Sequence, residues 1–221
     1  HLVTGTSADY TLTLPAASGN GGKLLGLRMG TTSTLTKLIT VDGNAGETID
    51  GALTRVMWSD EVAILLCDGS NWFKVAGKSI PMIGAYYLST DMTGLTNATE
   101  TLWSPVTTHI DNTGLMVNTS SKEITVKRDG NYTIALNSVN YVSNATALIF
   151  AAAKEGSNYK LAAFNNGGVA ATNCVASASG TFALVAGNVI KAYIYLSVAT
   201  GATFTAGQHV SFMHLTEVPK W

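Results

Sequence analysis

The residues that could carry out catalysis do not form a recognisable catalytic motif in this sequence. Three carboxylates in the second half, Asp91, Glu100 and Asp111, could approach one another in the fold, and a pair of carboxyl groups is what glycosidic cleavage requires. Their spacing singles out no pair. A glycine-rich segment ends at Lys23 but lacks the first glycine and the final Ser or Thr of a phosphate-binding loop. The sequence therefore predicts no enzyme, with a glycan depolymerase or esterase as the rival hypothesis.

Metal and thiol chemistry is no better supported by the spacing of the residues that provide it. His209 and His214 are five residues apart, so on one strand they point to opposite faces and cannot share a metal ion. Cys67 and Cys174 each lie in an apolar run, which predicts buried side chains. Residues 42–50 contain oxygen-bearing side chains without the spacing of a calcium loop. We expect no cofactor, with a calcium ion at residues 42–50 as a minor alternative.

Aromatic side chains are the remaining groups that could bind a ligand. Trp103, Tyr159 and Phe164 lie beside turn-rich segments, where an exposed ring could stack on a sugar or anchor a protein contact. Packing in the core is the alternative for each ring. Trp72 and Phe73 are neighbours on an expected strand, so one should point inward and the other outward. The first three rings are the candidate receptor-binding residues.

The composition predicts that β-strands position these residues. The chain has 221 residues, and its 29 Thr and 22 Gly favour strands and turns respectively. Charged residues make up 12% of the chain, against about 25% in a typical protein. The net charge of −1 lacks the cationic excess on which binders of nucleic acid or anionic membranes rely. No apolar run approaches the ~20 residues of a membrane span, so membrane insertion is not expected.

Alternating apolar residues and turn signals divide the chain into two β domains. Residues 10–14 and 124–127 alternate apolar and polar side chains, and Asp129 and Gly130 turn the chain into a return strand at residues 132–136. Further strands are expected at residues 146–153, 159–164, 177–185, 189–198 and 209–218. These features predict a small barrel or sandwich followed by a larger sandwich.

A glycine- and proline-containing segment marks the expected boundary between the two domains. We assign residues 1–76 to a small β module, residues 77–84 to a linker and residues 85–221 to the head. The chain begins with His1 rather than Met and has no signal-peptide pattern. We therefore expect the sequence to be a fragment or a processed product of a longer protein.

The second half contains strands that are apolar on both faces and few charges to keep such faces in water. Between Lys160 and Glu217 the only charged residue is Lys191. A strand that is apolar on both faces needs cover on both, and a neighbouring subunit is a natural source of the second cover. The candidate residues of an interface between subunits are Tyr193, Tyr195, Met213 and Leu215. A monomeric sandwich with uncharged polar residues outside is the alternative.

Two stretches resemble known β modules. Residues 4–76 resemble a module that recurs in bacteriophage tail fibres and tailspikes, through the strand YTLTLP at residues 10–15 and the turn and strand DGSNW at residues 68–72. Residues 84–218 resemble the jelly-roll head of complement-type globular domains and of tumour necrosis factor, through ITV at residues 124–126 and LVAGNVI at residues 184–190. In that family the last motif usually has Asp where this chain has Asn188.

The resemblance implies a homotrimer whose C-terminal head is the receptor-binding tip of a phage tail fibre or tailspike. Such a head acts on the virion, outside the bacterial cell, and adheres to a surface polysaccharide or an outer-membrane component. The alternative is a trimerisation or folding clamp for a tailspike whose polysaccharide-degrading activity lies upstream. In either case the expected fold is all-β, a small barrel or sandwich module followed by a jelly-roll head, assembled as a trimer.

Overall fold

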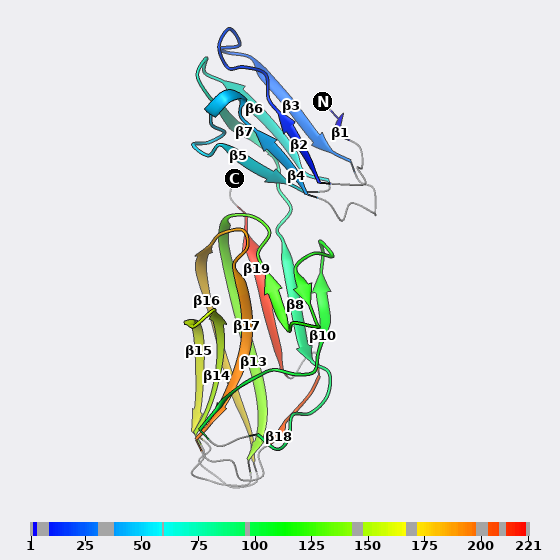
Figure 1. Cartoon of the computed structure of the whole chain (residues 1–221), viewed down its shortest axis with the longest axis vertical. Coiled ribbons are helices and arrows are strands. Elements are labelled where there is room, and N and C mark those ends of the chain that lie inside the picture. The colour runs from blue at the N-terminus through cyan, green and yellow to red at the C-terminus, as the bar shows by residue number, and fades with distance from the viewer. Residues whose placement is uncertain are drawn as a thin grey trace. The chain divides into compact units, whose positions relative to one another are not determined.

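The computed structural model describes residues 2–3, 9–30, 38–58, 60–95, 98–142, 148–166, 172–197, 203–207 and 211–219. It divides into two compact units, His1–Ile80 with Pro219–Trp221 (unit 1) and Pro81–Val218 (unit 2), and Figure 1 labels most of their strands. The one helix among the described residues is the short 3-10 helix η1, Asn44–Gly46. Within the described part of the chain, no helix has the length and apolar character of a membrane span.

Unit 1 contains a four-stranded sheet in the order β1-β3-β6-β7 and a three-stranded sheet in the order β2-β4-β5. The strands of the larger sheet are β1 (Leu2–Val3), β3 (Leu24–Met29), β6 (Val62–Cys67) and β7 (Trp72–Lys78). Those of the smaller sheet are β2 (Tyr10–Thr13), β4 (Ile39–Asp42) and β5 (Thr54–Met57). The expected small β module is therefore present.

The core of unit 1 is formed by apolar side chains from both of its sheets. Trp72 is 2% exposed and its indole Nε1 donates to the carbonyl oxygen of Pro15 at 3.2 Å, whereas Phe73 is 40% exposed. The expected inward and outward division of these two rings is confirmed. Cys67 is buried as expected. The side chain of Cys174 lies outside the described residues.

Unit 2 is a jelly-roll β-sandwich of two antiparallel sheets. One sheet, named here the β13 sheet, has the strand order β10-β8-β19-β13-β16, with β18 also paired to β13. Its strands are β8 (Ile83–Leu88), β10 (Val106–Asp111), β13 (Gly130–Val142), β16 (Thr172–Leu184), β18 (Thr203–Phe204) and β19 (Phe212–Val218). The expected jelly-roll class is confirmed.

The second sheet of unit 2, named here the β14 sheet, has the strand order β11-β12-β17-β14-β15, with β9 also paired to β17. Its strands are β9 (Glu100–Leu102), β11 (Val117–Asn118), β12 (Glu123–Thr125), β14 (Leu148–Glu155), β15 (Asn158–Asn166) and β17 (Val189–Leu196). Figure 1 shows β14, β15 and β17 side by side in yellow to orange.

Two expectations about connections need correction. The strand at residues 124–127 and the return strand at residues 132–136 do not pair as neighbours, because β12 belongs to the β14 sheet and β13 to the β13 sheet. The chain therefore crosses between the sheets there instead of forming a hairpin. The linker is also shorter than residues 77–84, since β7 extends to Lys78 and β8 begins at Ile83.

A buried tyrosine links the two sheets of unit 2. Tyr86 on β8 is fully buried, and its hydroxyl oxygen accepts a hydrogen bond from the backbone N–H of Ala192 on β17 at 2.9 Å. Ala192 lies where the edge of β17 changes partner from β12 to β9. Burial raises the pKa of the Tyr86 phenol, so the hydroxyl stays neutral. The tyrosine thus satisfies a backbone donor at a break in the sheet.

Removal of this hydroxyl should destabilise unit 2 without altering its shape. Tyr86→Phe keeps the ring in the core but leaves the buried N–H of Ala192 without its acceptor, which costs about 1 to 3 kcal/mol. Urea unfolding of the variant and the wild type at equal protein concentration measures the difference. An unchanged unfolding midpoint would show that Tyr86 contributes only its ring.

Candidate functional site

The outward face of the β14 sheet gathers aromatic rings around a charged pair. The ladder places Phe150 opposite Tyr195, and Lys154 opposite Tyr159. On the other side of β17, Leu102 lies opposite Tyr193. Since residues that face each other across a ladder share one face, these side chains come together although four strands, β9, β14, β15 and β17, supply them.

Glu100, Lys154 and Tyr159 form a connected polar group on this face. The Lys154 Nζ lies 2.7 Å from Glu100 Oε2, and the Tyr159 hydroxyl donates a short hydrogen bond to Glu100 Oε1. The side chains of Lys154 and Glu100 are 12% and 28% exposed. Both oxygens of the carboxylate are thus engaged, and the carboxylate fixes the positions of the ammonium and the phenol.

The aromatic rings pack around the lysine ammonium. The Lys154 Nζ lies 4.5 Å from the ring centroid of Tyr159 and 5.2 Å from that of Tyr193. Phe150 meets Tyr159 edge to face, with ring centroids 5.5 Å apart. Tyr159 nevertheless stays 53% exposed. We name this group the Tyr159 cluster: Glu100, Phe150, Lys154, Tyr159 and Tyr193.

The electrostatics of the Tyr159 cluster keep its ion pair charged at neutral pH. Partial burial by itself would raise the pKa of Glu100, but the hydrogen bonds from Lys154 and Tyr159 outweigh it and hold that pKa below its ordinary value. The hydrogen bond to Glu100 raises the pKa of Lys154 and also that of Tyr159. The carboxylate, the ammonium and the neutral phenol are therefore the forms present.

Replacement of the carboxylate should destabilise unit 2 in a pH-dependent way. The pKa of Glu100 is depressed by folding, so its stabilising contribution is complete above the ordinary value of 4.5 and is lost as the pH falls through the folded pKa. Urea unfolding should separate Glu100→Gln from the wild type at about pH 7, and the difference should be smaller at a pH below 4.5. An equal difference at both pH values would contradict this role for the ion pair.

The three candidate receptor-binding rings have different positions in the structure. Trp103 is fully buried and packs against Phe204 with ring centroids 6.5 Å apart, so the expectation of an exposed Trp103 is wrong. Trp103 directly follows the short strand β9, and its ring fills space in the core beneath the sheet that contains β9. Tyr159 is exposed. Phe164 belongs to β15, and its side chain lies outside the described residues.

Sequence reasoning missed two members of the Tyr159 cluster, Phe150 and Lys154, and proposed Glu100 only as a possible acid. The sequence of β14 shows no alternation of apolar and polar residues, because it contains three consecutive alanines, Ala151, Ala152 and Ala153. All three are fully buried. The cluster forms only once β9, β14 and β15 are in register. A signal was present in the motif of Lys154 and Tyr159 flanking a glycine turn, since such a hairpin brings both side chains to one face.

The outward face of the β13 sheet has the opposite character, because it lacks formal charge. Strands β8, β13, β16 and β19 together contain one charged residue, Glu217, which is buried. His214 is half-buried on this face, and its burial and the nearby His109 lower its pKa, so it is neutral at pH 7. The outward residues of these strands include Tyr87, Thr133, Ala135, Asn137, Val139, Val175, Ser177, Ser179, Thr181, Phe212, His214 and Thr216.

The candidate trimer-interface residues divide between core and surface. Met213 and Leu215 are fully buried inside unit 2, so their assignment to an outward face is wrong. The physical reason is the Arg128–Glu217 ion pair, which holds the side chain of Glu217 inside. Because side chains two residues apart on a strand point to the same face, residues 213 and 215 also point inward. Tyr193 and Tyr195 do lie half-exposed, but on the β14 sheet. The four residues therefore do not all lie on one common face.

The candidate carboxylates for glycosidic cleavage have other partners. Asp111 accepts hydrogen bonds from the backbone N–H groups of residues 113, 116 and 117. Asp91 Oδ1 accepts one from the N–H of Ala206 at 2.7 Å. Each therefore fixes a loop of unit 2, while Glu100 belongs to the Tyr159 cluster. No pair of them is brought together as an acid and a base by these contacts.

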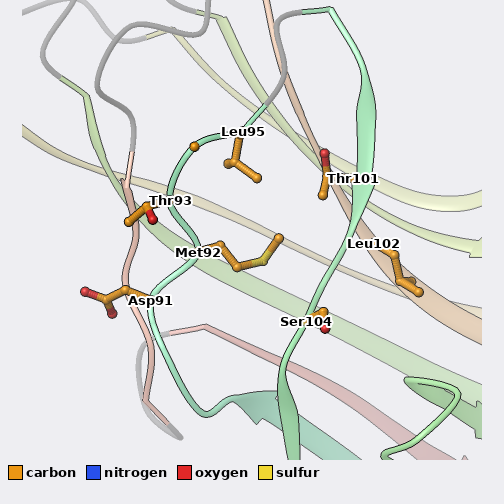
Figure 2. A pocket seen from close by; sticks show the side chains of 8 residues that line it. Asp91, Met92, Thr93, Leu95, Thr101, Leu102 and Ser104 are labelled. Atoms are coloured by element: carbon orange, nitrogen blue, oxygen red, sulfur yellow. The ribbon is translucent and has the colours of Figure 1, made fainter.

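A cavity of about 360 Å³ lies between residues 91–95 and the segment that contains β9. Figure 2 shows the side chains of Met92 and Leu95 on one arm, with Thr101 and Leu102 on the other. Its one charged residue is Asp91, whose carboxylate is the acceptor for Ala206. The hydroxyl groups of Thr93, Thr101 and Ser104 also line it, but the lining contains no histidine and no second carboxylate to act as their base.

Two carboxylates of residues 42–50 accept hydrogen bonds from backbone N–H groups of unit 1. Glu47 Oε1 accepts a hydrogen bond from the N–H of Ala17 at 2.7 Å, and Asp50 Oδ1 accepts one from the N–H of Lys74 at 2.9 Å. In the described ranges, no three His, Cys, Asp or Glu side chains are grouped to hold a metal ion. His209 lies outside those ranges, so its expected position relative to His214 stays a prediction.

Comparison with known proteins gives similarity to solved structures alone. No protein-family model and no curated protein matches the chain. Murine APRIL aligns at 10% identity and a TM-score of 0.47, over 63% of this chain and 100% of that chain. Eiger TNF from S. frugiperda aligns at 11% identity and a TM-score of 0.44, over 64% of this chain and 96% of that chain. No relative assigns a function, so the function is inferred from this chain's own residues.

Proposed function

We propose that unit 2 is the trimeric receptor-binding head of a bacteriophage tail fibre or tailspike, which adheres to a bacterial surface glycan or outer-membrane component. The observation that supports it is the unequal charge of the two outward faces. Strands β9, β12, β14, β15 and β17 carry six charges, all of which form ion pairs, whereas β8, β13, β16 and β19 of the β13 sheet carry one, the buried Glu217. The charged face of the β14 sheet is suited to contact with water, and the uncharged face of the β13 sheet is suited to contact with another protein chain.

The uncharged face is the proposed contact between copies. A sheet face with Phe212, Tyr87 and Val175 partly exposed and without a charge has little to keep it solvated. A second copy presents the same kind of surface, so no charge of either copy is desolvated when the faces meet. The trimer follows from the resemblance of residues 84–218 to trimeric jelly-roll heads. This proposal places the interface between copies on the β13 sheet and no longer at Tyr193 and Tyr195 of the β14 sheet.

Three copies also give the adhesion its strength. If one contact with a surface glycan is millimolar, three linked sites can raise avidity by about 10² to 10⁴ without any new contact. The β14 sheet stays free to meet the receptor when the β13 sheet is covered. The polar, paired surface of the β14 sheet is compatible with a hydroxyl-rich ligand.

Adhesion of the whole chain to immobilised bacterial surface polysaccharides tests this proposal. Lipopolysaccharide and capsule preparations from a panel of strains serve as probes, with competition by the soluble polysaccharide. Saturable, competed binding supports the receptor-binding head. A chain that forms trimers but adheres to no preparation favours the folding clamp, and the release of new reducing ends during incubation would show an enzyme.

A further inference from the structure

We propose that the Tyr159 cluster is a binding site for neutral pyranose rings of a glycan. This inference deepens the proposed function, because it assigns the residues and the ligand class of the adhesion site. The site consists of an exposed tyrosine ring and a polar group that lies beside it on the same outward face of the β14 sheet.

The first argument is the fixed orientation of an exposed ring. Tyr159 is 53% exposed, yet its hydroxyl is bound to Glu100, its ring meets Phe150 edge to face and the Lys154 ammonium lies 4.5 Å from its centroid. A ring held in this way loses little conformational freedom when a ligand stacks on it. An exposed tyrosine in a merely structural role would not need three constraints.

The second argument is the hydrogen-bonding capacity beside that ring. The Lys154 ammonium has three N–H donors, and the carboxylate of Glu100 can accept more hydrogen bonds than the two described. Donors and acceptors next to each other match the vicinal hydroxyl groups of a sugar, each of which donates and accepts. The apolar face of a pyranose would lie on Tyr159 while its hydroxyls reach the ion pair.

The third argument concerns charge, which selects a neutral ligand. Glu100 neutralises Lys154, and the two other ion pairs of the β14 sheet, Lys160–Glu155 and Lys191–Glu123, are neutral in the same way. An anionic sugar would need a cation free of a carboxylate, and none of these three pairs provides one. A protein partner is less favourable, since covering the ion pair with apolar groups would desolvate both charges.

Saturation-transfer NMR on the whole chain tests the site with the methyl glycosides of glucose, galactose and N-acetylglucosamine, and with glucuronic acid as the anionic probe. We expect transfer to at least one neutral glycoside and none to glucuronic acid. Tyr159→Ala should weaken binding at least about tenfold, and Tyr159→Phe should weaken it less because the ring remains. Tyr10→Ala is the matched control, because Tyr10 of unit 1 is 44% exposed and should not affect binding.

The outcomes separate the site from the adhesion that it would serve. Equal transfer for Tyr159→Ala and the wild type, transfer to no neutral glycoside, or preference for glucuronic acid would each overturn the site. The thermal transition and the solution mass of each variant show whether it is folded. If Tyr159→Ala still adheres to surface polysaccharide, the head keeps its proposed function and this site is wrong. If the wild type binds a glycoside but adheres to no polysaccharide, the site stands and the adhesive function is wrong.

Discussion

Ala135→Glu is expected to convert the proposed trimer into monomers, with a threefold fall in the mass measured in solution. Ala135 lies on β13, in the interior of the uncharged face, between His214 on β19 and Ser179 on β16. It is partly exposed in the single chain, so a glutamate there can stay hydrated when the chain is alone. Light scattering at micromolar concentration measures the change.

The expected effect is large because the new carboxylate would be covered only in the assembly. An unpaired charge that is moved out of water costs several kcal/mol, and the cost recurs in every copy. The matched control is Ala162→Glu, which makes the same change on β15, on the outward face of the other sheet. That variant should stay trimeric. A trimer with Ala135→Glu, or a monomer with Ala162→Glu, would contradict the assignment of the interface.

Glu217→Ala is expected to give the largest loss of stability in unit 2, about 3 to 5 kcal/mol, because it removes the buried carboxylate that pairs with the mostly buried Arg128 guanidinium. Glu217 accepts hydrogen bonds from Arg128 Nε at 2.7 Å and Nη2 at 2.6 Å. It also accepts one from the backbone N–H of Met82 at 3.0 Å. Both side chains are mostly buried, so water cannot replace the lost carboxylate.

Urea unfolding with separate fits for the two units measures the loss. Lys78→Ala, which breaks the exposed pair between Lys78 and Asp60, is the control and should change little, because exposed ion pairs contribute weakly. The protein concentration must be held constant, since the stability of an assembly depends on it. If both variants lost the same stability, burial of the Arg128–Glu217 pair would not be the reason for its strength.

The positions of the strands were predictable from the sequence, but the direction of their side chains often was not. The expected strand at residues 189–198 is β17, Val189–Leu196, because its alternation is regular. In β19 each set of alternate residues contains both apolar and polar side chains, so hydrophobicity leaves the inward set undetermined. The burial of Glu217 determines which set points inward. The sequence does not predict this burial, because a charged residue at the end of a strand is ordinarily expected on the surface.

The candidate site shows the same limit on a larger scale. Tyr159 was predictable as an exposed ring beside a turn, whereas Trp103, chosen on the same ground, fills the core. The two differ in what lies opposite them after folding, and local sequence does not contain that information. Glu100 and Lys154 are 54 positions apart in the chain, so their ion pair depends on the order of strands in the sheet.

Absolute mass in solution tests the central claim most directly. The chain has a mass of 23.1 kDa, and the proposed trimer, held together through the uncharged face of the β13 sheet, has about three times that mass at micromolar concentration. Light scattering coupled to size-exclusion chromatography gives the value independently of shape. A single species of 23.1 kDa would show that this face stays in water without a partner, and would contradict the proposed trimeric head.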